Sequence, residues 1–191
     1  LLLAVADEDG MKVLYNDGSG HFPPSPTDFP STTGLASPML VDVDTDGDLD
    51  AVYAYDFDGN LVIRLNDGTG QFAPEIAVGT LASSVNRLRW ADIDGDDVPD
   101  LIASADGDDR IVWYPNLGNA TFGAQQVVAI LNGPRGLDVA DFDGDFDKDI
   151  AATSWFDGLV VYYLNDGTGQ FSEQHLISND PYAPLWLCAD D

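Results

Sequence analysis

Three short acidic segments carry the side chains in this sequence that are best suited to chemistry. Each segment is nine residues long and has aspartate at its first, third, fifth and ninth positions. The aspartates are Asp42, Asp44, Asp46 and Asp50; Asp92, Asp94, Asp96 and Asp100; and Asp141, Asp143, Asp145 and Asp149. Two unit charges 4 Å apart repel each other by roughly 4 kcal/mol at an effective dielectric constant near 20. Four carboxylates converging in one short loop therefore need a cation between them.

The cation that these ligands indicate is calcium. Calcium takes six to eight oxygen ligands, whereas magnesium prefers fewer carboxylates and a stricter octahedron. Zinc is disfavoured because the segments contain no histidine or cysteine. The seventh residue should contribute its backbone carbonyl, since its side chain varies: Asp48, Val98 and Asp147. We expect the ninth residue to complete the shell, with one calcium ion per segment and three in all. The alternative is a solvated acidic turn without metal.

The acidic segments belong to an internal repeat of about 49 residues. A second landmark, best preserved as Asn-Asp-Gly-Thr-Gly-Gln-Phe from Asn66 to Phe72, keeps the same period. Its first residue recurs at intervals of 50, 50 and 49, as Asn16, Asn66, Asn116 and Asn165. The first acidic residue recurs at intervals of 50, 49 and 49, as Asp42, Asp92, Asp141 and Asp190. Two landmarks in step over four copies indicate a repeat protein.

Each repeat contains four short runs rich in β-branched and aromatic residues, separated by Gly, Asp and Asn. In the third repeat these runs are 86–91, 99–105, 110–115 and 122–130. Pairs such as Asp58-Gly59 predict tight hairpins between the second and third runs. No segment has a convincing helical period. Four antiparallel strands per repeat of this length predict an all-β fold, a β-propeller.

The predicted division treats 1–191 as a single propeller segment, a fragment of a larger ring. It comprises a partial blade at 1–35, blades at 36–82, 83–132 and 133–180, and the start of a further blade at 181–191. The last part should place Cys188, the only cysteine, as a buried apolar residue in a strand at 184–189.

Charge and composition exclude several classes of protein. The chain has 34 acidic and 7 basic residues, for a net charge of −27. Nucleic-acid binding requires clustered Lys and Arg, so it is not expected. No apolar run is long enough to span a bilayer, so we expect no direct membrane insertion. The acidic segments account for the paired carboxylates, and no nucleophile motif accompanies them, so we do not expect an enzyme.

The acidic segment resembles the calcium loop of FG-GAP and VCBS-type repeats, as in the β-propeller of integrin α subunits. The resemblance covers essentially the whole chain, with the VCBS branch the closer match. In that family the loop joins the first and second strands of a blade. The usual pattern is Asp-x-Asp-Gly-Asp-Gly, but each segment here keeps only one of the two glycines: Gly47, Gly95 and Gly144.

The resemblance implies a non-catalytic, calcium-stabilised adhesion or protein-interaction module, located outside the cell or at its surface. Its partners would be other proteins, extracellular matrix or glycans. One glycosylation sequon, at Asn119, agrees with secretion. Three alternatives remain open: a self-assembling subunit of an extracellular filament or matrix, a lectin-like propeller, and the scaffold of a larger secreted enzyme. For a lectin, Trp155 and Phe156 are the aromatic residues that we would test as exposed contacts.

Overall fold

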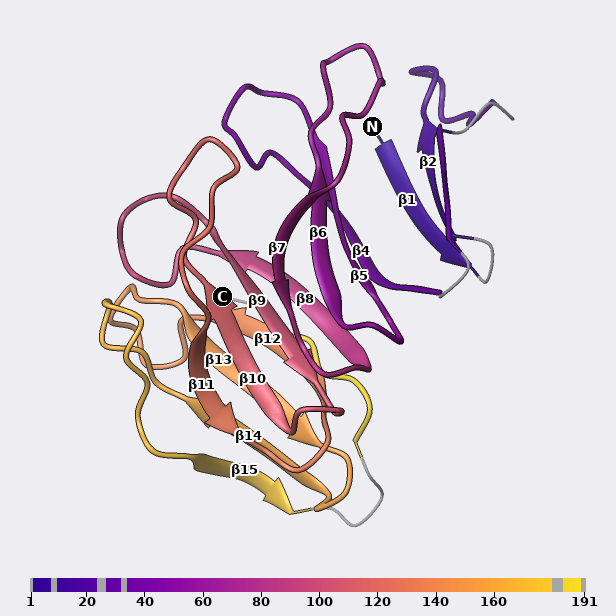
Figure 1. Ribbon diagram of the computed structural model, residues 1–191. Coiled ribbons are helices and arrows are strands. Elements are labelled where there is room, and N and C mark those ends of the chain that lie inside the picture. The colour runs from indigo at the N-terminus through magenta and orange to yellow at the C-terminus, as the bar shows by residue number, and fades with distance from the viewer. Residues whose placement is uncertain (1, 8–9, 24–26, 32–33, 180–183, 190–191) are drawn as a thin grey trace.

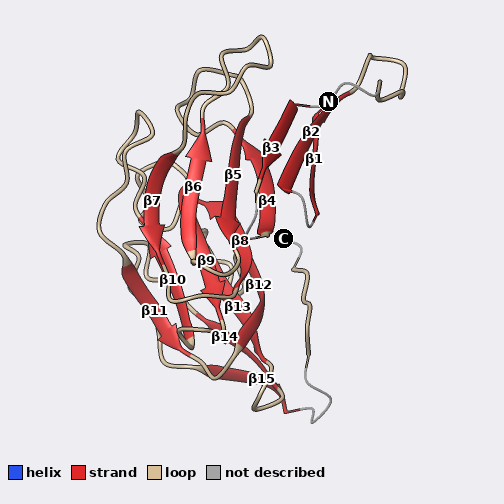
Figure 2. Ribbon diagram, turned by 45° about the vertical axis from the view of Figure 1, so that its right-hand side comes forward, coloured by secondary structure: helices blue, strands red, loops and turns tan. Residues whose placement is uncertain are grey.

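The computed structural model describes residues 2–7, 10–23, 27–31, 34–179 and 184–189. These residues form fifteen strands and no helix (Figures 1 and 2), as the repeat predicts. Within the described part of the chain there is accordingly no helix that could cross a membrane. The strands form one three-stranded and three four-stranded sheets, and every sheet is antiparallel with its strands in chain order.

The four sheets follow one another along the chain. The first contains β1 (Leu2–Asp7), β2 (Gly10–Tyr15) and β3 (Thr27–Pro30). The second contains β4 (Leu35–Val41), β5 (Asp50–Tyr55), β6 (Asn60–Arg64) and β7 (Ile76–Thr80). The third contains β8 (Val85–Ala91), β9 (Asp100–Ala105), β10 (Arg110–Tyr114) and β11 (Gln126–Ile130). The fourth contains β12 (Pro134–Ala140), β13 (Asp149–Ser154), β14 (Leu159–Tyr163) and β15 (His175–Asn179).

The sheets stand side by side as blades, as Figure 1 shows. Contacts between neighbouring blades run mainly through their first strands, β4 with β8 and β8 with β12. The fourth strands β7, β11 and β15 form the opposite edges of the blades. This architecture of successive four-stranded antiparallel blades is that of a β-propeller, and the described chain forms part of one.

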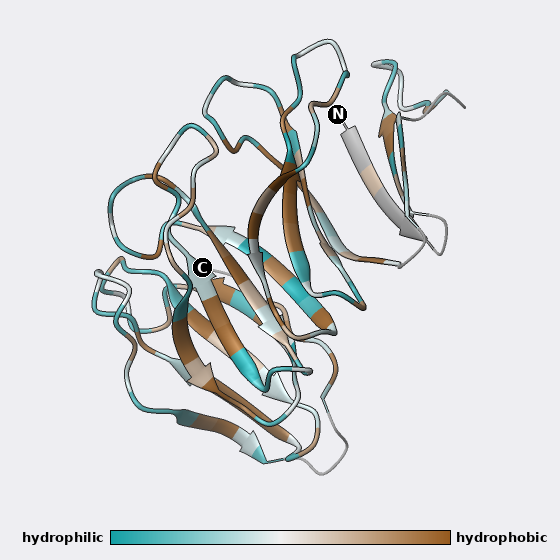
Figure 3. Cartoon of the chain, in the orientation of Figure 1, coloured by the Kyte–Doolittle hydropathy of each residue, from teal (hydrophilic) through white to brown (hydrophobic). Residues whose placement is uncertain are grey.

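The hydrophobic cores lie between the blades rather than within one central core. Alternation along a strand sends successive side chains to opposite faces. In β9, Leu101 and Ala103 pack with the second blade, whereas Ile102 packs with the fourth. All six residues of β9 and of β13 are buried for this reason. Figure 3 shows the result as hydrophobic strands joined by hydrophilic loops.

Two kinds of loop occupy the same end of every complete blade. The acidic segments connect the first strand to the second, and the turns that begin at Asn66, Asn116 and Asn165 connect the third to the fourth. These turns read Asn-Asp-Gly in the second and fourth blades and Asn-Leu-Gly in the third. Because the strands are antiparallel, these two connections lie at one end and the hairpin between the second and third strands lies at the other. Gly59 and Gly158, predicted to supply left-handed backbone in those hairpins, have φ of 64° and 66°.

The C-terminal segment differs from the prediction. Residues 184–189 form no strand, and Cys188 is exposed rather than buried. A strand needs a neighbour to satisfy its backbone groups, and no described strand pairs with this segment. It lies instead along β12, where the Ala189 amide donates to Asp138 Oδ2 at 2.8 Å. Asp190, the fourth acidic landmark, lies outside the described residues.

Candidate metal centre

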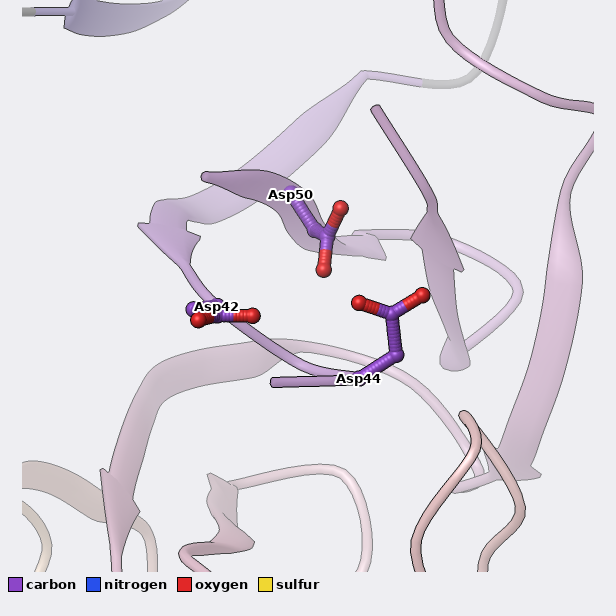
Figure 4. A group of neighbouring side chains, drawn as sticks. All are labelled: Asp42, Asp44 and Asp50. Carbon is purple, nitrogen blue, oxygen red and sulfur yellow. The ribbon is translucent and has the colours of Figure 1, made fainter. Parts of the chain in front are cut away.

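Each acidic segment winds so that several of its carboxylates converge. Asp42, Asp44 and Asp50 place carboxylate oxygens within 4.8 Å of one another, and Figure 4 shows these three groups pointing toward a common centre. The same holds for Asp92, Asp94 and Asp96 in the second loop and for Asp141, Asp143 and Asp149 in the third. Positions one and three therefore meet in all three loops.

The first aspartate organises the loop by accepting a hydrogen bond from a backbone amide later in the same loop. Its Oδ2 accepts from the amide of the sixth residue, at 2.9 to 3.0 Å, in the pairs Asp42–Gly47, Asp92–Asp97 and Asp141–Phe146. The fifth aspartate likewise accepts from the amide of the seventh residue, in the pairs Asp46–Asp48, Asp96–Val98 and Asp145–Asp147. These bonds fold the segment back on itself and leave further oxygens for a cation.

The winding requires left-handed backbone at the fourth and sixth positions of every loop. Glycine supplies it once per loop, at Gly47, Gly95 and Gly144. The other position has an ordinary side chain with positive φ: 63° at Thr45, 67° at Asp97 and 77° at Phe146. The loops thus keep one geometry although each lacks a glycine of the Asp-x-Asp-Gly-Asp-Gly pattern, and a non-glycine residue in this conformation costs about 1–2 kcal/mol.

Two carboxylate oxygens show that the donor set fits a cation. Asp42 Oδ1 and Asp94 Oδ1 are buried and have no hydrogen-bond partner among the described residues. An ionised oxygen in this position is costly unless a positive charge faces it. The all-oxygen surroundings match the preference of calcium for carboxylate and carbonyl ligands. Bound there, calcium would neutralise the converging charges and fix the loop between two strands.

The ninth aspartate has a further role that its spacing did not reveal. Asp50 is fully buried, and its two oxygens accept from the backbone amides of Val43 and Asn66, each at 2.8 Å. Asp100 accepts in the same way from Ile93 and Asn116, and Asp149 from Phe142 and Asn165. The side chain therefore ties the acidic loop to the turn between the third and fourth strands of its own blade.

Burial sets the electrostatics of these ninth aspartates. It raises the pKa of Asp50 and Asp149 above its usual range and that of Asp100 to about 6, although the backbone amides act in the opposite direction. The third and fifth aspartates of each loop add Coulomb repulsion with the same sign. A metal-free loop therefore takes up protons at a higher pH than ordinary aspartates do, and a bound cation would oppose this uptake.

Not every predicted ligand joins these groups. The carboxylates of Asp46, Asp145 and Asp100 lie outside the convergent sets. The side chains of Asp48 and Asp147 lie against Gly68 and Gly167 of the neighbouring turn, so only their backbone carbonyls suit the role predicted for position seven. Val98 at the same position can also offer only its carbonyl.

The asparagine that begins each turn, which the sequence shows only as a marker of the repeat, connects neighbouring blades in the third and fourth repeats. Asn116 Nδ2 donates to Pro99 O within its blade at 3.1 Å and to Val43 O of the preceding blade at 3.4 Å. Asn165 Nδ2 donates in the same way to Lys148 O at 3.1 Å and to Ile93 O at 2.7 Å. Each of these turns thus bonds to the acidic loop of the blade before it. The strict period of this asparagine was the available signal.

Comparisons with known proteins agree with the repeat and the fold. A family described as FG-GAP-like repeat matches three overlapping stretches, residues 1–53, 42–103 and 92–152. No curated protein gives a significant match. A solved lectin of Agrocybe aegerita, described as specifically recognising non-reducing terminal N-acetylglucosamine, superposes with a TM-score of 0.67 at 23% identity. The match covers 94% of this chain and 53% of the lectin, so the chain spans about half of that protein.

A second solved structure is less similar. The Tc holotoxin pore of Photorhabdus luminescens matches with a TM-score of 0.49 at 16% identity, over 91% of this chain and 9% of that one.

Proposed function

The chain belongs to the FG-GAP-like repeat family, and from that membership we propose that it is a non-catalytic, calcium-stabilised module for adhesion or protein interaction outside the cell. Three bound calcium ions, one per acidic loop, would hold the blades rigid. Its partners would be proteins or glycans of the extracellular matrix or of other cell surfaces.

The observation that carries the calcium proposal is the pair of orphaned buried oxygens, Asp42 Oδ1 and Asp94 Oδ1. A solvated acidic turn would expose such oxygens to water or give them hydrogen-bond donors. Loop calcium sites in extracellular modules typically have dissociation constants of about 10⁻⁴–10⁻³ M. Sites of this strength fill at extracellular calcium levels, which supports a location outside the cell.

The interaction role is supported by the architecture. Stiff blades present loops and turns on a fixed frame, and such positions commonly carry binding residues. Exposed aromatic side chains occur at three of these connections: Phe57, Phe146 and Phe156 are 72%, 91% and 63% exposed. Large exposed apolar groups on a rigid frame are suited to contact a partner.

The test combines metal and partner measurements on the same protein. Calorimetric titration of the metal-free chain should give three calcium sites, and titration with magnesium should give weaker or fewer sites. An array of matrix proteins and glycans should then retain the chain in calcium and release it in chelator. Absence of calcium binding would overturn the metal part of the proposal. Calcium binding without retention on any array element would overturn only the adhesion part.

A carbohydrate-binding propeller is the second candidate, favoured by the likeness of its fold to the Agrocybe aegerita lectin. Of the two aromatic residues singled out earlier, Phe156 is exposed, whereas the Trp155 ring is covered by Arg135, whose Cζ lies 4.5 Å from its centroid. Retention on glycans but not on proteins, reduced by Phe156→Ala, would favour this candidate.

A further inference from the structure

Three of the seven basic side chains gather on the first strands of the third and fourth blades. Arg87 and Arg89 lie on β8 and Arg135 lies on β12, and these two strands contact each other. The repeat does not require arginine there, since the positions equivalent to Arg87 are Ser37 and Gly136. In a chain with a net charge of −27, this cluster is a local exception that needs a cause of its own.

Two of the three arginines are neutralised by carboxylates and the third is not. Arg89 Nε lies 2.7 Å from Asp138 Oδ1, and Arg135 Nη2 lies 3.2 Å from an oxygen of Asp106. Arg87 forms no ion pair with any described residue. Its Nη1 donates to the backbone carbonyl of Asn86 at 2.6 Å, and its Cζ lies 3.4 Å from the centroid of the Trp186 ring.

The surroundings of Arg87 disfavour its positive charge. Burial, together with the neighbouring Arg89, lowers the pKa of the Arg87 guanidinium. Arg87 also lines a cavity of about 170 Å³, together with Asn86, Arg135, Leu185 and Trp186. The Trp186 side chain is 71% exposed although one face meets Arg87, so most of the indole remains open to solvent.

Asn86 is held in place at this cavity. Its Nδ2 donates to the carbonyls of Ser84 and Pro134, both at 3.1 Å, which bridges the third and fourth blades. The carboxamide oxygen accepts no hydrogen bond from the described residues. The cavity thus combines a guanidinium that has no carboxylate partner among the described residues, a fixed amide acceptor and an open aromatic surface.

We propose that this cavity binds the carboxylate of an acidic sugar, such as a uronic-acid unit. The planar guanidinium of Arg87 matches a carboxylate with two parallel hydrogen bonds. A hydroxyl of the sugar would donate to Asn86 Oδ1, and its C–H face would rest on the indole of Trp186. A single negative charge suits the site better than a phosphate, because the acidic chain repels a dianion more strongly.

The proposal can be tested by NMR on the folded, calcium-loaded chain, with the Trp186 indole N–H as reporter. Sodium glucuronate should shift this signal saturably, whereas glucose, acetate and inorganic phosphate should bind more weakly. Arg87→Ala should weaken glucuronate binding at least about tenfold, the usual effect of losing hydrogen bonds to a charged group. Arg110→Ala, which removes an exposed arginine of β10, is the matched control and should leave binding unchanged.

Three results would overturn the assignment. No saturable glucuronate shift in the wild-type chain would remove the site. Equal binding of glucose or phosphate would contradict a carboxylate ligand, and equal binding of acetate would contradict a sugar. If Arg87→Ala does not fold, Arg87→Lys keeps the charge without the planar fork, and wild-type affinity in that variant would contradict recognition by the guanidinium.

Discussion

The two acidic connections at the same end of the second and fourth blades have opposite electrostatics. In the acidic loops, burial raises the pKa of Asp50, Asp100 and Asp149. In the Asn-Asp-Gly turns the pKa is lowered at Asp67 and Asp166, because the neighbouring threonine donates both its hydroxyl and its amide to each carboxylate. The turns satisfy their charges internally, whereas the loops leave converging carboxylate oxygens that we propose are satisfied by a cation. A count of acidic residues does not distinguish the two.

Removing calcium should have the largest effect on stability. We expect this effect to come from the acidic loops and not from the Asn-Asp-Gly turns. A ligand at 100 times its dissociation constant stabilises the folded state by about 2.7 kcal/mol per site. We therefore expect excess chelator to lower the melting temperature strongly and calcium to restore it, as measured by differential scanning calorimetry. An unchanged melting temperature would show that the loops, like the turns, satisfy themselves.

Matched substitutions in the acidic loop and in the Asn-Asp-Gly turn should have the next largest effect, because only the loop is expected to bind calcium. Asp94→Asn should reduce the number of bound calcium ions from three to two in a calorimetric titration, because it removes a charged ligand from the second loop. Asp67→Asn should leave three ions bound, since an amide oxygen can still accept from Thr69. In chelator, Asp94→Asn should be more stable than wild type, because the substitution relieves the repulsion between the carboxylates of the second loop. Equal stoichiometry in both variants would contradict the assignment of the loop.

The pH dependence of the metal-free chain should show the same contrast. Asp100 has a folded-state pKa of about 6 against an unfolded value of 3.8, so the folded state binds its proton more tightly. The resulting stabilisation is fully present below about pH 4 and is lost as pH rises through about 6. Asp67 and Asp166, with lowered pKa, contribute with the opposite sign, and their stabilisation is lost only as pH falls below about 4.

Thermal melts in chelator between about pH 4 and pH 7 would measure this dependence. Asp100→Asn should flatten the curve, and calcium should reduce the decline because its charge would offset the repulsion that Asp94 and Asp96 exert on Asp100. Metal-free stability that rises steadily through this range would contradict the environment described for Asp100.

Backbone strain within a single loop should give the smallest effect. Phe146 has φ of 77° and is 91% exposed, so its side chain contributes little packing to offset the strained conformation. Phe146→Gly should stabilise the calcium-loaded chain by about 1 kcal/mol. Gly144→Ala is the converse change, at φ of 83° with no atom within 4 Å of an added Cβ, and should destabilise it by a similar amount. Denaturant midpoints would measure both, and a stabilising Gly144→Ala would contradict the strain.

The sequence was sufficient for most strands of the complete blades and for the acidic loops, because both depend on local chemistry. The run 110–115 was predicted from its β-branched and aromatic residues and is the strand Arg110–Tyr114. The convergence of Asp42 with Asp44 followed from their spacing. What the sequence did not reveal depends on contacts between blades. The bond from Asn165 to Ile93 joins residues far apart in the chain, and the stacking of Arg87 on Trp186 requires the third blade and the C-terminal segment to meet.

The prediction for Cys188 failed for the same reason. A residue can be assigned to a buried strand from the repeat, but the assignment holds only where a neighbouring strand covers it. The backbone conformation at the fourth position of the acidic loop was also not evident from residue type. Thr45 adopts there the positive φ that glycine supplies at Gly95 and Gly144. The fold imposes this conformation on whatever side chain is present.

The bonds from Asn116 to Val43 and from Asn165 to Ile93 should also influence how the molecule responds to mechanical load. The third and fourth blades each bond to the acidic loop of the blade before them, so a pull applied at one of these blades should pass to its neighbour through that loop. Loss of an ion from one loop would loosen the next blade directly and more distant blades only through it. Under tension the array should therefore yield stepwise, and calcium in the surrounding fluid would set the force at which each step occurs.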